Sequence, residues 1–242
     1  MTEISHGETI LSRQLKQIVA VGTEEVIITT GLFDGILVKY CQSLDLPLHF
    51  TFVKNPEYKT TNYIYSIYCA RKYVDDDILL MHEDFIFEDS IMEEVFISNQ
   101  SYMTVSSPLP LPEKDFKAVV HNGRIEKVGV KFFNEAMVAQ PLYKLTNKDW
   151  KVWLECIVSF CDVSNTKIYA VDALNEVSKD CEIRALDVES KLCNEIDNPE
   201  DFAVVSAKLQ EVESRMVYMY FSTDIIHSGH IAIIKKHSAL GN

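Results

Sequence analysis

The 242-residue sequence lacks the features that mark several protein classes. It has only eight glycines, and none are spaced as G-x-G, so these residues include no glycine-rich phosphate-binding loop of that type. No apolar run approaches the ~20 residues of a membrane span, and no basic segment followed by an apolar one opens the chain. The six cysteines form no C-x-x-C pair, which argues against a zinc or disulfide framework.

Composition and charge narrow the remaining classes. The sequence is 47% hydrophobic and 24% charged, enough for one sizeable core with room for a small second unit. The cysteines fall mostly in predicted helices and strands, as expected for a reduced, cytoplasmic protein. A net charge of −13 argues against nucleic acid as the main partner. This negative charge is compatible with a site in which carboxylates hold Mg²⁺ and which binds a nucleotide only as its metal complex.

Helical and strand patterns alternate in the first half of the chain. Periodicity predicts helices over residues 8–21, 34–43, 62–74 and 88–97. Apolar runs predict strands over residues 25–30, 48–53, 78–82 and 101–106. This alternation predicts an α/β fold with a mostly parallel sheet and helices on both faces.

The second half adds a hairpin and more helices. Alternating runs over 117–121 and 124–130 flank Asn122-Gly123, which is the strongest short signal for a β-hairpin. Helices are expected over residues 148–161, 169–178 and 199–214, and a strand over 182–188. The sequence therefore predicts a small β-hairpin insertion in the α/β fold.

One segment carries more chemical information than the others. The pattern N-P-x-Y-x-x-x-N-x-x-x-S begins at Asn55 and places Asn62 and Ser66 on one side of a helix. A short apolar strand follows and leads to Asp84. Ligands in open α/β sheets bind beyond the carboxyl ends of strands, so Asp84 is expected where a metal-bound phosphate would lie. The alternative is a solvated carboxylate at the end of a strand.

A second acidic segment reads E-I-D-N-P-E-D-F and contains Asp197. Two carboxylates from distant segments are typical of a phosphoryl-transfer site, where a metal offsets charge on the phosphate. The alternative is a helix cap, because Asp197 or Asn198 before Pro199 is a good helix N-terminus. The two interpretations are compatible.

These two motifs resemble the sugar-nucleotidyltransferase family, most closely its phosphocholine and 2-aminoethylphosphonate cytidylyltransferase branch. The resemblance covers about residues 1–209 and implies a Rossmann-like fold of the GT-A type. It implies that Asp84 and Asp197 hold Mg²⁺ and that Asn55, Asn62 and Ser66 position CTP or the acceptor. Glu83 replaces the glycine that precedes the aspartate in that family.

Family members also open with a strand and a G-x-G-x-R loop, which this sequence does not contain. The missing strand would be central, between the strands at 25–30 and 78–82, and its loss leaves unpaired backbone on both. We therefore expect that the chain starts late and is weak or inactive as written. The alternative is a degenerate homologue.

The last residues carry a separate resemblance. A strand pattern at 216–221 precedes His227-Ser228-Gly229-His230 and an apolar helix, as at the start of the HxGH nucleotidyltransferases. The resemblance implies that His227 and His230 contact phosphates, and that 216–242 opens a second domain. Some such fusions belong to phosphonate metabolism.

Two rival functions are a GT-A glycosyltransferase, which would use Mn²⁺ and a nucleotide sugar, and a non-catalytic nucleotide-binding module. The missing loop and Glu83 are consistent with the non-catalytic module. The sequence leaves open the nucleotide base, the acceptor and the oligomeric state.

Overall fold

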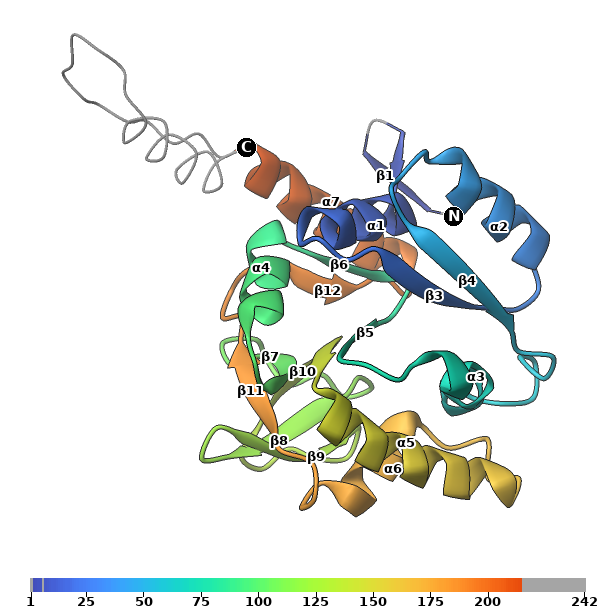
Figure 1. Ribbon diagram of the computed structural model, residues 1–242. Coiled ribbons are helices and arrows are strands. Elements are labelled where there is room, and N and C mark those ends of the chain that lie inside the picture. The colour runs from blue at the N-terminus through green and yellow to red at the C-terminus, as the bar shows by residue number, and fades with distance from the viewer. Residues whose placement is uncertain (1, 6, 215–242) are drawn as a thin grey trace, which may run out of the picture.

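The structure is a computed structural model in which residues 2–5 and 7–214 are described (Figure 1). The helices are α1 (Ile10–Ala20), α2 (Asp34–Ser43), α3 (Tyr63–Ala70), the 3₁₀ helix η1 (Arg71–Tyr73), α4 (Asp89–Ile97), α5 (Asn147–Asp162), α6 (Ala170–Val177) and α7 (Pro199–Glu213). The strands are β1 (Glu3–Ser5), β2 (Glu8–Thr9), β3 (Glu25–Thr30), β4 (His49–Lys54), β5 (Ile78–Met81), β6 (Phe85–Phe87), β7 (Ser101–Ser106), β8 (Lys117–His121), β9 (Arg124–Gly129), β10 (Ala136–Leu145), β11 (Ile183–Asp187) and β12 (Cys193–Glu195). The expected strand and second domain at 216–242 lie outside the described residues.

The largest sheet has six strands in the order β5-β10-β7-β11-β9-β8, and β10 also pairs with β8. The α/β class is confirmed, with one correction to the pairing. Strands β7 and β11 are parallel, but β10 runs antiparallel to β5, β7 and β8, so the sheet is mixed rather than mostly parallel. The sequence did not reveal β10, because Pro141 interrupts its pattern. The pairing with β7 shifts register between Ala139 and Tyr143, around this residue without a backbone N–H.

Strands β3 and β4 form a separate parallel pair. Within the described part of the chain, β3 pairs only with β4, and β5 pairs only with β10. Both strands therefore have one edge without a strand partner among the described residues. All four residues of β5 are partly exposed, although all are apolar.

The predicted hairpin is confirmed between β8 and β9. His121 pairs with Arg124, which leaves Asn122 and Gly123 as the two-residue turn. Their φ angles are +51° and +74°. Positive φ at both central residues is the requirement of a type I′ turn, and Asn-Gly meets it at low cost.

Two of the three apolar clusters among the described residues lie on either side of the large sheet. One is built around Trp150 and Trp153 of α5, which packs with α6 against the strands (Figure 1). The other joins α1 and α4 through Leu15, Phe85 and Ile91. All six cysteines are free thiols, as expected. No helix in the described ranges is long and apolar enough to cross a membrane.

Candidate functional site

The turn between β5 and β6 carries His82, Glu83 and Asp84, and a buried side chain of α1 fixes its backbone. Gln14 is 4% exposed and its Nε2 donates to the carbonyl oxygens of His82 and Phe85, both at 2.8 Å. The turn therefore presents its side chains from a backbone held at both ends.

Strand β12 brings the second acidic segment to this turn. It pairs antiparallel with β6, with Glu195 opposite Phe85, and the N–H of Ile196 donates to the Asp84 carbonyl oxygen at 2.9 Å. Because this pairing continues one residue past each strand, Glu195 lies beside the turn although it is distant in sequence.

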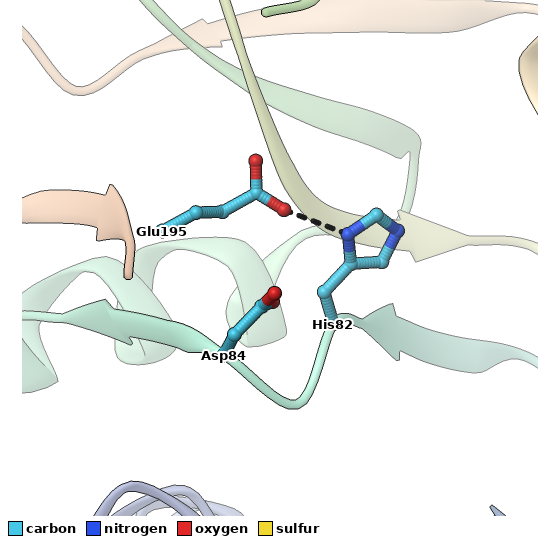
Figure 2. Close-up of side chains that lie close together, drawn as sticks. All are labelled: His82, Asp84 and Glu195. Carbon is cyan, nitrogen blue, oxygen red and sulfur yellow. Dashed lines mark hydrogen bonds and ion pairs between the residues drawn. The ribbon is translucent and has the colours of Figure 1, made fainter. Parts of the chain in front are cut away.

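Figure 2 shows the side chains of His82, Asp84 and Glu195 converging from these two segments. Each offers a ligand atom, and the three atoms lie within 4.8 Å of one another. His82 Nδ1 and Glu195 Oε1 are 2.8 Å apart. Asp84 Oδ1 is buried and has no hydrogen-bond partner among the residues that the structure describes. Burial raises the pKa of the Asp84 carboxyl above its ordinary value, and the Glu195 charge adds to this rise.

Asp197 lies two residues beyond Glu195 and is exposed. The residue that caps α7 is Asn198, the neighbour of Asp197. Its side chain accepts a hydrogen bond from the N–H of Asp201 at 2.9 Å, and Pro199 starts the helix. The Asp197 carboxylate takes no part in that cap. Burial raises the pKa of the Asp197 carboxyl above its ordinary value, and the negative charges of Glu195 and Asp115 raise it further. Asp197 therefore lies in the same negative field, but outside the three-residue cluster.

Two of the residues expected to contact nucleotide, Asn55 and Ser66, are hydrogen-bonded to each other. Asn55 is 2% exposed and its Nδ2 donates to Thr61 Oγ1 at 3.2 Å and Ser66 Oγ at 3.1 Å. Asn62 caps α3 by accepting from the N–H of Tyr63 at 2.7 Å. In this structure their polar atoms shape the 55–66 segment, and their expected contact with a ligand stays a prediction. His227 and His230 lie outside the described residues.

This donor set fits a divalent cation. Carboxylate oxygens are ligands that Mg²⁺ accepts, and a buried carboxylate oxygen without a donor is costly unless a ligand or ion satisfies it. Asp84 supplies that orphaned oxygen, and Glu195 can supply a second carboxylate from the neighbouring segment.

Sequence reasoning missed three contributors to this site. It did not single out His82 or Gln14, and it took Glu195 only as part of the motif around Asp197. The E-x-D spacing was an available signal for Glu195, because alternate residues of a strand point to one face. No local pattern marks Gln14, since its partners are backbone carbonyls of a distant turn.

Known proteins resemble this chain mainly in fold. No family model matches the sequence. A curated CMP-5'-(3-aminopropyl)phosphonate synthase from Streptomyces rubellomurinus is 28% identical over 104 residues, which cover 43% of this chain and 17% of that protein. The match thus spans less than a fifth of that relative.

Two solved cytidylyltransferases and a pyrophosphorylase cover most of the chain. The inositol-1-phosphate CTP transferase of T. maritima superposes with a TM-score of 0.62 at 19% identity and covers 84% of this chain and 83% of its own. The CTP:phosphocholine cytidylyltransferase of Streptococcus pneumoniae superposes with a TM-score of 0.66 at 13% identity. The match covers 85% of this chain and 87% of the cytidylyltransferase. An apo UDP-glucose pyrophosphorylase superposes with a TM-score of 0.68 at 14% identity. The match covers 87% of this chain and 89% of the pyrophosphorylase. At these identities the likeness establishes the architecture: the chain has the α/β nucleotidyltransferase fold, of the GT-A-like Rossmann type.

Proposed function

We propose that this domain is a cytidylyltransferase that joins CTP to a phosphorylated or phosphonylated small alcohol or amine. The observation that carries the proposal is the orphaned, buried Oδ1 of Asp84 in the turn between β5 and β6 of a nucleotidyltransferase fold. Its neighbours His82 and Glu195 complete a polar cluster that could hold a metal ion.

In the proposed reaction, a phosphate or phosphonate oxygen of the acceptor attacks the α-phosphorus of CTP. The new P–O bond forms as the bond from the α-phosphorus to the bridging oxygen breaks, and pyrophosphate leaves with that electron pair. Such a transfer depends chiefly on positioning and on neutralising charge.

We assign Mg²⁺ to Asp84 and Asp197, as the resemblance implies. When bound, Mg²⁺ would offset the growing charge on the phosphate oxygens. Asp84 is held for this task by Gln14 and by the pairing with Ile196, while exposed Asp197 is accessible from solvent. We assign Asn62 and Ser66 to the orientation of the nucleotide or the acceptor. Asn55 holds Ser66 in position through its hydrogen bond to the Ser66 hydroxyl.

The acceptor is assigned by the chemistry of the similar proteins. The curated relative is named for a CMP-aminopropylphosphonate product, and one structural neighbour is named for phosphocholine. Both acceptors pair an anionic phosphorus group with a cationic nitrogen. We therefore favour an aminoalkylphosphonate or a phosphorylated amino alcohol, with CTP as the nucleotide.

A non-catalytic nucleotide-binding module is the second candidate. Two observations favour it: exposed Glu83 adds a negative charge next to Asp84, and the 242 residues contain no G-x-G. For the same reasons we expect slow turnover by the chain as written.

The test incubates the full 242-residue chain with CTP, Mg²⁺ and one of three acceptors: 2-aminoethylphosphonate, 3-aminopropylphosphonate or phosphocholine. Product and pyrophosphate are followed by ³¹P NMR. We expect slow formation of a CMP or CDP conjugate that falls about 100-fold or more in Asp84→Asn, because a charge-stabilising group in the transition state is lost.

Asp180→Asn, an exposed carboxylate outside the site, is the matched control and should keep the wild-type rate. CTP binding without any conjugate would favour the non-catalytic module. Hydrolysis of a UDP-sugar would favour a glycosyltransferase instead, and turnover unchanged in Asp84→Asn would remove the site from the reaction.

A further inference from the structure

We propose that His82 and Glu195, together with Asp84, form a nitrogen-containing site for a divalent transition-metal ion, with Mn²⁺ preferred over Mg²⁺. The inference deepens the proposed function: it keeps Asp84 as a metal ligand, and it takes His82 and Glu195 in place of Asp197 when the ion is a transition metal. It is tested without nucleotide or turnover.

The first support is the donor set. One imidazole and two carboxylates converge within 4.8 Å. Mg²⁺ prefers an all-oxygen shell, much of it water, whereas imidazole is a good ligand for first-row transition ions. A site for Mg²⁺ alone gains little from His82, while a site for Mn²⁺ gains a ligand.

The second support is spacing. Two ligand atoms at right angles on an ion with bonds of ~2.1 Å lie ~3.0 Å apart. His82 Nδ1 and Glu195 Oε1 are 2.8 Å apart, so an ion can take the place of the hydrogen that now lies between them with little side-chain movement. The two side chains are 31% and 27% exposed, which leaves the ion open to solvent and to further ligands.

The third support is the state of Asp84. Its Oδ1 is shielded from solvent, yet nothing in the described chain donates a hydrogen bond to it. A carboxylate oxygen in that state is unfavourable until a cation or donor reaches it. The bond from His82 to Glu195 leaves this oxygen unsatisfied, whereas an ion that binds Asp84 through Oδ1 satisfies it.

Hydrogen bonds and packing hold the scaffold around the three residues, as a metal site requires. Gln14 holds the carbonyl of His82, and Ile196 holds that of Asp84. The His82 ring also packs edge-on against Tyr63, with ring centroids 5.2 Å apart. The ligands therefore lose little freedom when an ion binds.

The experiment is a titration of the full chain with MnCl₂ in the absence of nucleotide. Free Mn²⁺ is followed by its EPR signal, and imidazole coordination by ¹⁴N modulation in pulsed EPR. We expect one Mn²⁺ per chain with a ¹⁴N coupling, and displacement by Mg²⁺ only at more than tenfold excess. His82→Ala should abolish the ¹⁴N coupling, weaken Mn²⁺ binding about tenfold or more and leave Mg²⁺ binding nearly unchanged. Glu195→Gln, which keeps the shape of the side chain, should also weaken Mn²⁺ binding.

The matched control is His121→Ala, which removes an exposed histidine at the β8–β9 hairpin and should change nothing. The double variant His227→Ala/His230→Ala should also retain the coupling. If the ¹⁴N signal survives in His82→Ala, or disappears with the C-terminal pair, the proposal is overturned. Equal losses of Mn²⁺ and Mg²⁺ affinity in His82→Ala would show a merely structural role and would also reject it. Turnover with Mg²⁺ and CTP would stand in either case, so the two proposals fail separately.

Discussion

The ring of Tyr63 packs against the imidazole of His82 with centroids 5.2 Å apart and planes inclined by 67°. Tyr63 is the first residue of α3, and its hydroxyl accepts a hydrogen bond from the N–H of Val171 at 3.3 Å. One side chain thus links the N-terminus of α3, the α6 helix and the candidate metal site. The segment from Asn55 to Ser66 therefore reaches the site through a ring contact, in addition to any direct contact with a ligand.

We predict that Tyr63→Ala weakens Mn²⁺ binding and destabilises the fold by roughly 3 kcal/mol, since it removes the ring that orients His82 and leaves a cavity. Tyr63→Phe keeps the ring and should retain metal affinity, at a cost of about 1 kcal/mol for the lost hydrogen bond. EPR titration and urea unfolding measure the two effects. Equal metal affinity in all three proteins would show that the ring contact does not orient the ligand.

Gln14 is predicted to be a positioning residue. Gln14→Ala leaves two carbonyl oxygens of the Asp84 turn without their donor, so stability should fall by about 1–3 kcal/mol. Metal affinity should fall as well, because the turn is no longer held. Gln100→Ala, an exposed glutamine, is the control for stability and affinity. Loss of stability with unchanged metal affinity would separate Gln14 from the site.

Asp149 is a buried carboxylate that we predict to be structural. It accepts from Thr146 Oγ1 at 2.9 Å and from the N–H of Glu182 at 3.0 Å, and also from Ser101. Asp149→Ala should cost about 3 kcal/mol, because it leaves several buried donors without an acceptor. The result is read from urea unfolding. A Mn²⁺ affinity that changes while the protein remains folded would contradict the purely structural role.

The pair of Asp77 and Lys144 should make stability depend on pH. Lys144 Nζ lies 2.9 Å from the Asp77 carboxylate, and the N–H of Asn147 donates to it at 2.8 Å. The hydrogen bond from Lys144, followed by that from Asn147, lowers the pKa of Asp77 in the folded state. A lowered pKa stabilises the fold above the unfolded value of ~3.9, and this contribution is lost as pH falls through the folded pKa.

Asp77→Asn should therefore cost about 1 kcal/mol at pH 7, a modest value because the Asp77 side chain is 45% exposed. The difference from wild type should shrink as the pH is lowered below ~3.9. Unfolding in urea at several pH values measures it. The same cost at pH 7 and at pH 3 would show that ionisation of Asp77 plays no part.

The local elements could be predicted from the sequence because their signals are local. The strand at Glu25–Thr30, the helix at Asp34–Ser43 and the strand at Ser101–Ser106 have the predicted bounds, and the Asn122-Gly123 turn joins the predicted strands. In each case the period of apolar residues or the chemistry of a turn residue fixes the backbone within a few positions. The same reasoning predicted the apolar strand that precedes Asp84; β5 ends at Met81, and Asp84 lies in the turn that follows it.

Tertiary structure decided what these elements contact. The sequence indicated Asp84 and Asp197 as the metal-binding pair, but the pairing of β12 with β6 brings Glu195 closer to Asp84 and leaves Asn198 to cap α7. Likewise, the long strand β10 was hidden by Pro141, and its three antiparallel partners turn the expected parallel sheet into a mixed one. Periodicity reports which residues are buried along one element. The choice of partner strand depends on backbone hydrogen bonds between distant segments, and these leave no pattern in the sequence around either residue.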